Sequence, residues 1–470
     1  MAFVQQDSLV DLIRSSRGVV VVDHRGLGAE DMEDGARRAA AYLRARGVCR
    51  GDGVVLVDDG GGAELLMTLL GAWWLGARAM IVAATDDARE VDSAVAATDA
   101  SVVVRGQPTG QGSEVAYRSV LTGSQPLTAA PECGPSDVAL DIATSGTTGT
   151  RKYVSFTHGA LLANVTGIAK RLSLTRQDRL YTPLPMSIAG VIGMLLLPGM
   201  LAGSSIHLGR LGGVRIAQSH RQLEATRPTL VYGVPYMYEL LSGQSRSVDF
   251  DGLRWLICSS APLPSSTFDR VWQRFGVPPR SSYCLAEAGT VTLNTSDDLE
   301  VVRNTVGEPL DGTTIRTEPA DSASAGRIVV SGPSCGLGYR TGGQVDLFPS
   351  GEVWTRDLGM LERGLLTVAG RVDDVIQVAG TNVDLAHVRS VIGRCPGLGE
   401  FALVAADHGR LGRVPVLLVV AGTMSTTVRD VLHFCRTALR DVEVPREVRV
   451  VTEIPRTATG KARLREEYGR

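Results

Sequence analysis

The feature that most constrains this chain is a run rich in threonine and glycine, Thr144-Ser145-Gly146-Thr147-Thr148-Gly149-Thr150-Arg151-Lys152. Its two glycines free the backbone to bend around a ligand, and its hydroxyls and closing lysine suit a polyphosphate. Residues 137–143 predict a strand before the run, and Thr157 can cap a helix from His158 to about Lys170. The run therefore predicts a strand, a phosphate-holding loop and a helix, with a plain surface turn as the alternative.

Lysine is rare in this chain, which makes its positions informative. Only three of the 48 basic residues are lysines, and two of them end loops rich in glycine or threonine, at Lys152 and at Lys461 in the segment Pro455–Lys461. A compact ammonium delivers a point charge where a planar guanidinium does not fit. We therefore expect Lys152 and Lys461 to be functional cations. The alternative is that lysine is simply tolerated at exposed positions.

Length and composition bound the function classes. A chain of 470 residues is long enough for two or more domains. Its formal net charge of -2 argues against a nucleic-acid partner. The longest apolar stretch, residues 188–203, is interrupted by glycine and proline and is shorter than the roughly 20 residues of a membrane span. The first residues lack a signal peptide, so we expect a cytoplasmic protein. The cysteines and histidines are isolated, which argues against a zinc or disulfide framework.

Helical and strand patterns alternate before the loop. A helix is predicted over 29–46, a strand over 53–57, a helix over 65–75 and a strand over 79–82. This alternation is typical of a parallel α/β sheet. After the loop, an apolar helix is predicted over 188–201, antiparallel strands over 301–365, and a smaller α/β segment after Gly370.

Small or polar residues follow several of the predicted strands beyond the loop. These junctions are Thr182–Ser187, Leu230–Pro235, Trp255–Pro262 and Arg280–Glu287. Such junctions are what a ligand crevice at the carboxyl ends of a sheet requires. Glu287 stands among apolar neighbours, and a buried carboxylate needs a cation or donor, so we weigh metal binding against a satisfied core glutamate. Asp373 and Asp374 mark either a hinge or a solvated face.

These motifs, in this order, resemble those of the adenylate-forming superfamily, which includes acyl-CoA synthetases, aryl-CoA ligases, stand-alone adenylation domains and luciferases. The likeness covers essentially the whole chain. It implies an α/β fold in which a large N-terminal α/β domain with a β subdomain, residues 1–370, is joined by a hinge to a small, mobile C-terminal α+β domain, residues 371–470.

The resemblance also implies roles for individual residues. Lys461 would reach the substrate carboxylate and the α-phosphate, Asp373 would be the hinge, and Glu287 with Thr148 would hold Mg2+. The residues that would bind ATP are Thr144, Ser145, Gly146, Thr147, Thr148, Gly149, Lys152, Ser260, Ala261, Tyr283, Asp357 and Arg371. The residues that would line the acid pocket are Ser187, Tyr232, Val234, Met237, Ser260, Ala288 and Gly289.

The activity implied by the resemblance has two steps. A small carboxylic acid attacks ATP to form an acyl-adenylate and pyrophosphate, and the acyl group then passes to the thiol of CoA or of a carrier-protein phosphopantetheine. The chain holds no carrier domain, so we expect a carrier protein to act in trans. An amine or other nitrogen nucleophile is one alternative acceptor. A nucleotide-binding module with impaired catalysis is the alternative from another class.

Several positions depart from the family pattern. Ala286 stands where a threonine hydroxyl commonly meets the α-phosphate, and Thr290 or Thr292 could compensate. Ser187 replaces a frequent histidine, and Gln377 replaces a common lysine. Amino-acid adenylation domains usually carry an aspartate near the Ser187 segment, and Met186–Ala189 contains none. This absence disfavours an α-amino acid as substrate and favours a fatty or aryl acid.

Overall fold

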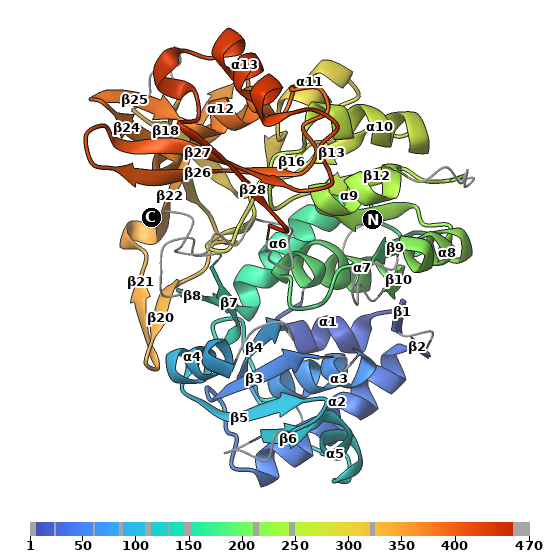
Figure 1. Ribbon diagram of the computed structural model, residues 1–470. Coiled ribbons are helices and arrows are strands. Elements are labelled where there is room, and N and C mark those ends of the chain that lie inside the picture. The colour runs from blue at the N-terminus through green and yellow to red at the C-terminus, as the bar shows by residue number, and fades with distance from the viewer. Residues whose placement is uncertain are drawn as a thin grey trace. The chain divides into compact units, whose positions relative to one another are not determined.

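The computed structural model describes residues 6–22, 25–59, 62–83, 88–108, 114–129, 131–144, 152–209, 216–243, 250–319 and 325–454 (Figure 1). The chain divides into two compact units. The first comprises Met1–Ile315, Val330–Val353 and Gly364–Leu366, and the second comprises Arg316–Val329, Trp354–Arg363 and Thr367–Arg470. The expected domain boundary between residues 370 and 371 stays a prediction.

An eight-stranded sheet forms one part of the first unit. Its strands, in spatial order, are β21 (Gln344–Leu347), β20 (Gly338–Thr341), β8 (Tyr153–Thr157), β7 (Val138–Ala143), β4 (Arg78–Ala83), β3 (Gly53–Asp58), β5 (Ala100–Arg105) and β6 (Glu114–Ala116). The strands from β7 to β6 run parallel, whereas β8, β20 and β21 join by antiparallel pairs. The predicted strands 53–57, 79–82 and 137–143 are thus confirmed as members of a mainly parallel sheet.

The sequence of β3 explains how this sheet is covered on both faces. Successive side chains of a strand point to opposite faces, and Val54 and Leu56 join one buried cluster while Val55 and Val57 join another. The first cluster includes α2 (Ala29–Ala45), α3 (Gly62–Trp74) and α5 (Tyr117–Thr122), and the second includes α4 (Ala88–Thr98). A continuous apolar strand is the expected pattern where both faces are buried.

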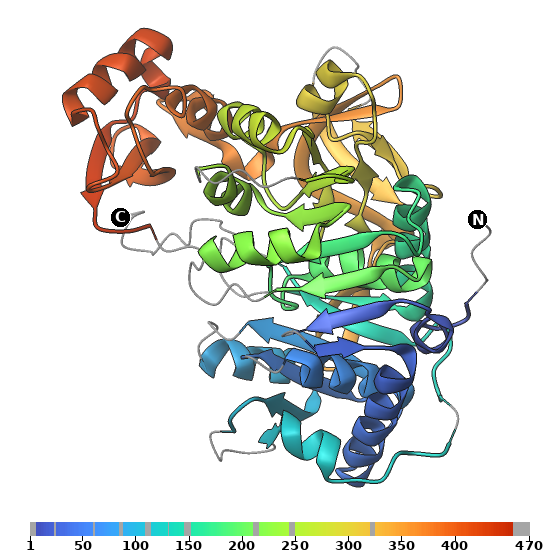
Figure 2. The same cartoon turned by 90° about the vertical axis from the view of Figure 1, so that its right-hand side faces the viewer.

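A seven-stranded sheet forms the other part of the first unit; in Figure 2 its mostly green strands and the blue and cyan strands of the eight-stranded sheet are both visible. Its strands, in order, are β13 (Pro279–Ser281), β12 (Trp255–Cys258), β11 (Leu230–Gly233), β9 (Arg179–Thr182), β10 (Ser205–Leu208), β1 (Val19–Val22) and β2 (Arg25–Leu27). Every pair is parallel except β1 with β2. The remaining elements of this unit are α1 (Leu9–Ser15), α6 (His158–Arg171), η1 (Val191–Leu196), α7 (Leu197–Ala202), α8 (Ile216–Thr226), α9 (Pro235–Ser242), α10 (Ser265–Phe275), α11 (Leu299–Asn304), β14 (Cys284–Leu285), β15 (Gly289–Thr290), β16 (Thr292–Leu293), β17 (Glu308–Pro309) and η2 (Pro349–Gly351).

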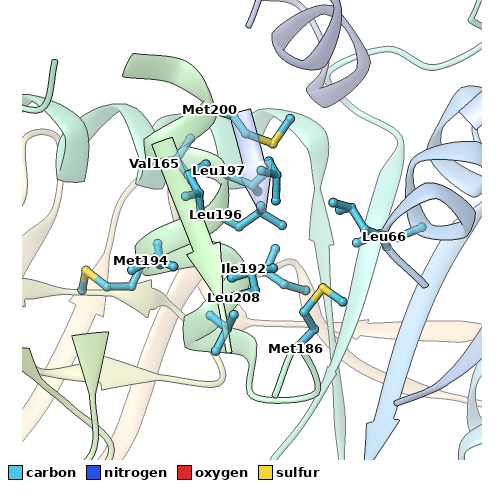
Figure 3. Close-up of a cluster of buried hydrophobic side chains, with 14 of the residues drawn as sticks. Leu66, Val165, Met186, Ile192, Met194, Leu196, Leu197, Met200 and Leu208 are labelled. Carbon is cyan, nitrogen blue, oxygen red and sulfur yellow. The ribbon is translucent and has the colours of Figure 1, made fainter. Parts of the chain in front are cut away.

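One apolar core holds the two sheets of the first unit together. Figure 3 shows part of this core, where Val165 of α6 and Leu66 of α3 lie among the methionine and leucine side chains that follow β9. Trp73, fully buried on α3, donates from its indole nitrogen to the carbonyl of Ala139 on β7 at 2.7 Å. The strand that leads into the phosphate loop is therefore anchored to the core. Thr157 accepts a hydrogen bond from the Ala160 amide at 3.0 Å, which confirms the predicted cap of α6.

Two predicted elements differ from the structure. The helix predicted over 188–201 begins at Val191 with the π-helical turn η1 and continues as α7. Pro198 has no amide hydrogen to donate to residue 194, which interrupts the regular α-helical pattern. The start of the predicted antiparallel region at 301 is also wrong, because α11 extends to Asn304. Asp298 accepts the Glu300 amide hydrogen bond at 2.9 Å and so begins a helix.

The second unit holds two sheets. Most of a four-stranded sheet lies here, in the order β18 (Thr314–Glu318), β19 (Gly326–Ser331), β22 (Glu352–Glu362) and β23 (Leu365–Arg371). The other sheet has the order β25 (Thr381–Asp384), β24 (Val375–Val378), β27 (Gly412–Val420) and β26 (Phe401–His408), with β28 (Glu447–Val451) beside β27. The 3-10 turns η3 (Val372–Asp374) and η4 (Asp441–Glu443) and the helices α12 (Leu385–Ile392) and α13 (Val428–Ala438) complete it. Alternate residues of β27 contribute to two cores, with Leu417 in one and Leu418 in the other.

No helix in the described ranges is long and apolar enough to cross a bilayer, as predicted from the interrupted apolar stretch. The cytoplasmic location stays a prediction.

Candidate active site

Four parallel strands of the seven-stranded sheet end at one edge, because β9, β11, β12 and β13 are paired in parallel. The residues that follow these ends are the junctions that the sequence singled out. They supply Ser187, Val234, Ser259 with Ser260, and Tyr283 to Glu287. This edge is where open α/β sheets bind their ligands, and we take it as the candidate active site.

The lysine that closes the loop meets the predicted metal-binding glutamate through a third residue, Tyr339. The Tyr339 hydroxyl donates a hydrogen bond to Glu287 Oε1 at 2.9 Å. The Lys152 ammonium lies over the face of the Tyr339 ring, 4.6 Å from its centroid. The motif analysis missed Tyr339. A signal was present in Gly338 and Tyr339 on a short strand, but nothing local to that strand connects it with Glu287.

Glu287 fits a magnesium site that is completed by substrate. Among the residues that the structure describes, no group of three or more His, Cys, Asp or Glu side chains could hold a metal ion. Mg2+ is usually bound by one or two carboxylates together with substrate phosphates rather than by an all-protein cage. A half-buried carboxylate beside the end of a phosphate loop has the chemistry for this role. Metal binding by Glu287 and Thr148 stays a prediction.

The base of the phosphate loop is closed by a backbone hydrogen bond. Thr144, at the end of β7, donates from its amide to the carbonyl of Lys152 at 2.8 Å. The two ends of the loop are therefore adjacent, as a loop that cradles phosphates requires. The predicted ligands Ser145, Gly146, Thr147, Thr148 and Gly149 lie outside the described residues.

A buried charge network lies on the other face of the same strands. Asp141 of β7, whose side chain is fully buried, accepts from Ser155 Oγ at 2.6 Å and from Arg340 Nε at 2.9 Å. Arg78 Nε lies 3.4 Å from the other carboxylate oxygen. Burial, and then repulsion by Arg340, lowers the pKa of the Arg78 guanidinium. The network connects β4, β7, β8 and β20 beneath the base of the loop.

The predicted acid-pocket residues on β11 and α9 are buried. Tyr232 exchanges a hydrogen bond with Ser259 Oγ at 2.8 Å, and burial raises the pKa of its phenol. A Cβ at Gly190 would overlap the Tyr232 hydroxyl, so this position requires glycine. Val234 and Met237 are also buried. An uncharged tyrosine with apolar neighbours forms one wall at this edge of the sheet.

The remaining predicted pocket residues, Ala288 and Gly289, lie in the turn between β14 and β15. Ala288 is buried, and Gly289 has a φ of 66°. Asn164 of α6 accepts from the Thr290 amide at 3.2 Å and donates to the Thr290 carbonyl at 2.8 Å. The helix that follows the phosphate loop therefore positions the turn that carries Glu287.

The predicted adenine-side loop has an unusual backbone. Ser260 adopts a φ of 75°, in the left-handed region that a residue other than glycine rarely occupies. Such strain persists only where the surroundings hold it, and it is common at ligand sites. Ser259 Oγ lies 3.5 Å from Ser260 Oγ, and Ala261 is exposed. The geometry of this loop is consistent with a binding role for both predicted residues.

Ser187 makes a contact that its segment does not indicate. Its amide donates to Asp58 Oδ2 at 2.9 Å, and its hydroxyl oxygen is buried without a hydrogen-bond partner in the described structure. Asp58 ends β3 and is separated from Ser187 by 129 positions. The sequence analysis treated the Asp58 region as a turn. Tertiary structure therefore supplies the carboxylate that the Met186–Ala189 segment lacks, although one of its oxygens is occupied by the backbone.

The structure does not support one of the proposed compensations for Ala286. Thr292 Oγ1 donates to the Val306 carbonyl at 2.6 Å and accepts from the Tyr283 amide at 3.3 Å. The Thr292 side chain is fully buried, so its hydroxyl serves the local backbone. Thr290 Oγ1 accepts from the Cys284 thiol at 3.6 Å. Tyr283 itself is buried, and its carbonyl accepts from the Val291 amide.

Within the second unit, the two predicted ribose-binding residues are in contact. Arg371 Nη1, at the end of β23, donates to Asp357 Oδ1 on β22 at 3.0 Å. Asp357 is nearly buried, whereas 47% of the Arg371 side chain is exposed. The predicted hinge residue Asp373 lies in the 3-10 turn η3 between β23 and β24. Lys461 lies outside the described residues.

The sequence matches two family descriptions. Residues 14–340 match the AMP-binding enzyme family, and residues 387–461 match the AMP-binding enzyme C-terminal domain. A feruloyl-CoA synthase from Amycolatopsis sp is 30% identical, with 95% of each chain covered. The long-chain-fatty-acid–CoA ligase FadD13 of Mycobacterium tuberculosis is 25% identical, with 92% of this chain and 91% of that enzyme covered.

Solved structures share the fold. ATP-bound MatB from Rhodopseudomonas palustris superposes with a TM-score of 0.87 at 24% identity, covering 99% of both chains. The o-succinylbenzoate CoA synthetase MenE from Bacillus subtilis, in complex with ATP and a magnesium ion, gives a TM-score of 0.85 at 20% identity, covering 97% of this chain and 98% of that one. The predicted fold class is confirmed. The chain belongs to the AMP-binding enzyme family, within the adenylate-forming superfamily that its motifs resemble.

Proposed function

We propose that this protein is an AMP-forming acid–thiol ligase that activates a fatty or aryl acid with ATP and transfers the acyl group to CoA. The observation that carries the proposal is the joining of Lys152 and Glu287 through Tyr339 at the carboxyl edge of the parallel strands. It places a cation for phosphates beside a carboxylate suited to Mg2+.

In the first step, a carboxylate oxygen of the acid bonds to the α-phosphorus of ATP, and the bond to pyrophosphate breaks. Negative charge builds on the phosphoryl oxygens, and groups that are already oriented toward it lower the barrier. Lys152 would bind the polyphosphate, and Lys461 would meet the acid and the α-phosphate. When bound at Glu287, Mg2+ would neutralise phosphate charge.

In the second step, the CoA sulfur loses its proton and attacks the acyl carbon of the adenylate. A carbon–sulfur bond forms, the bond between the acyl carbon and the phosphate oxygen breaks, and AMP leaves. The relatives described above are a feruloyl-CoA synthase and a fatty-acid–CoA ligase, which supports CoA over a carrier protein or an amine as the acceptor. The mobile role of residues 371–470, with Asp373 as the hinge, belongs to this proposal.

The buried wall supports an acid with an apolar body. Tyr232, Val234 and Met237 expose little or no surface to solvent. The Tyr232 hydroxyl is already bonded to Ser259, so it is not left requiring a partner from the substrate. Apolar walls with a few fixed polar groups are typical of small-molecule sites. A fatty or aryl acid matches this lining better than a zwitterionic amino acid does.

The test is acid-dependent exchange of pyrophosphate into ATP across a panel of fatty, aryl, dicarboxylic and amino acids, followed by product analysis with CoA, a loaded carrier protein and amines. We expect exchange with fatty or aryl acids and an acyl-CoA product. An amide product would replace CoA by a nitrogen nucleophile. ATP binding without exchange on any acid would favour the impaired nucleotide-binding module.

A further inference from the structure

Tyr339 is placed to act on both charged groups of the candidate active site. It lies on β20, opposite Val154 of β8, and 52 positions beyond Glu287 in the chain. Its hydroxyl reaches Glu287, and the face of its ring reaches Lys152. One side chain therefore contacts the end of the phosphate loop and the predicted metal ligand at the same time.

We propose that Tyr339 is a positioning residue for the binding of metal–ATP, an inference that rests on the proposed function. Its hydroxyl takes one oxygen of the Glu287 carboxylate, which orients the group and leaves the other oxygen for a divalent cation. Groups behind a ligand that fix its orientation commonly raise metal affinity in this way.

The ring has a separate task at Lys152. An aromatic face attracts an ammonium through its electron density but accepts none of its three N–H donors in a conventional hydrogen bond. Lys152 is thus held close to Glu287 with its donors available for phosphate oxygens. A direct ion pair between Lys152 and Glu287 would instead engage both charges that metal–ATP requires.

The ring of Tyr339 is itself held in place. Phe348 packs edge-on against it with ring centroids 5.1 Å apart, and the Gly336 amide donates to the Glu287 carbonyl at 2.9 Å. The next residue, Arg340, is fixed from the opposite face by Asp141. A side chain supported on both sides of its strand can serve as a rigid support for two mobile charged groups.

The hydroxyl and the ring are separated by two substitutions. Tyr339→Phe removes only the bond to Glu287, and Tyr339→Leu removes the ring contact with Lys152 as well. We measure binding of Mn2+–ATP to the full-length protein by electron paramagnetic resonance without acid, and binding of metal-free ATP by calorimetry. Tyr339→Phe is expected to weaken Mn2+–ATP binding about tenfold, in line with loss of a hydrogen bond to a charged group, and to leave metal-free ATP binding unchanged. Tyr339→Leu is expected to weaken both.

A double-mutant cycle identifies the partner. If the hydroxyl acts through Glu287, then Tyr339→Phe adds no further loss of Mn2+–ATP affinity to a Glu287→Gln protein. Tyr117→Phe is the matched control, because its buried hydroxyl donates to the Val57 carbonyl at 2.9 Å and contacts neither group. The control should retain wild-type binding of Mn2+–ATP.

Two results would overturn the inference: wild-type Mn2+–ATP affinity in Tyr339→Phe, or an undiminished effect of that change in the Glu287→Gln background. These binding results stand apart from the proposed function. If the wild-type protein exchanged pyrophosphate with no acid, the ligase proposal would fail, and the binding cycle would still decide the role of Tyr339.

Discussion

Two neighbouring residues of β20, Tyr339 and Arg340, show how one strand can serve the active site and the foundation. Because adjacent side chains point to opposite faces, Tyr339 contacts Lys152 and Glu287, whereas Arg340 bonds to the fully buried Asp141. The Lys152 side is exposed and the Asp141 side is dry. Charges that must meet a ligand are held by weak or single contacts, and charges that support the sheet are held by a closed network.

This contrast predicts its largest effect on stability at Asp141. Asp141→Asn removes the charge that faces Arg340 and Arg78, and breaking a buried ion pair on one side typically costs about 3–5 kcal/mol. Unfolding in urea should show this loss. Asp34→Asn is the control, because its pair with Arg38 is exposed and i,i+4 pairs are worth only about 0.3–0.5 kcal/mol. Equal losses in the two variants would remove the distinction between the faces.

The site side should behave in the opposite way. Lys461→Ala is expected to slow pyrophosphate exchange at least about 100-fold, since removal of one donor to developing charge commonly costs this much, while stability stays unchanged. Lys170→Ala, at the exposed end of α6, is the matched control and should keep full exchange. Full activity of the Lys461→Ala protein would contradict the catalytic role of this lysine.

His158 tests a third arrangement, a buried group kept neutral rather than paired. Burial lowers its pKa from 6.5 to about 4, and its Nδ1 accepts from the Leu9 amide at 3.3 Å. As pH falls below 6.5 the unfolded chain takes up a proton before the folded one does. The His158 contribution to stability is therefore full above pH 6.5, and about 3 kcal/mol of it is lost as pH falls to about 4.

Urea unfolding at pH values between 7 and 4 measures this loss. His158→Gln should flatten the slope of stability against pH, while His433→Gln, at an exposed position of α13, should leave the slope unchanged. An unchanged slope in the His158→Gln protein would show that His158 is protonated in the folded state.

The smallest effect is expected at Tyr232. Tyr232→Phe removes the hydrogen bond to Ser259, for a loss of stability of about 1 kcal/mol. It should also change the KM for the acid, because the ring forms part of the proposed pocket. Tyr238→Phe loses bonds to the Val231 and Ile257 carbonyls and should lower the Tm without changing that KM. The same KM in both variants and the wild type would remove Tyr232 from the pocket.

Local features of the fold were predictable from the sequence because they depend on nearby residues. The β7 strand, the cap at Thr157 and the start of α6 follow from short-range propensity and hydrogen bonding. The errors also have local causes, with Pro198 interrupting one helix and Asp298 starting another. The site residues Ser260, Glu287 and Asp357 were predicted from motifs whose spacing preserves backbone geometry.

The sequence by itself determined the family, the strand–loop–helix at Thr144–Lys152 and the residues expected at each strand end. Only the tertiary structure decided which of these residues touch. Tyr339 meets Glu287 across 52 positions, Ser187 meets Asp58 across 129 and Arg340 meets Asp141 across 199. Such contacts depend on strand order and register, which no local pattern specifies, because each strand carries only its own alternation of faces and not the identity of its neighbour.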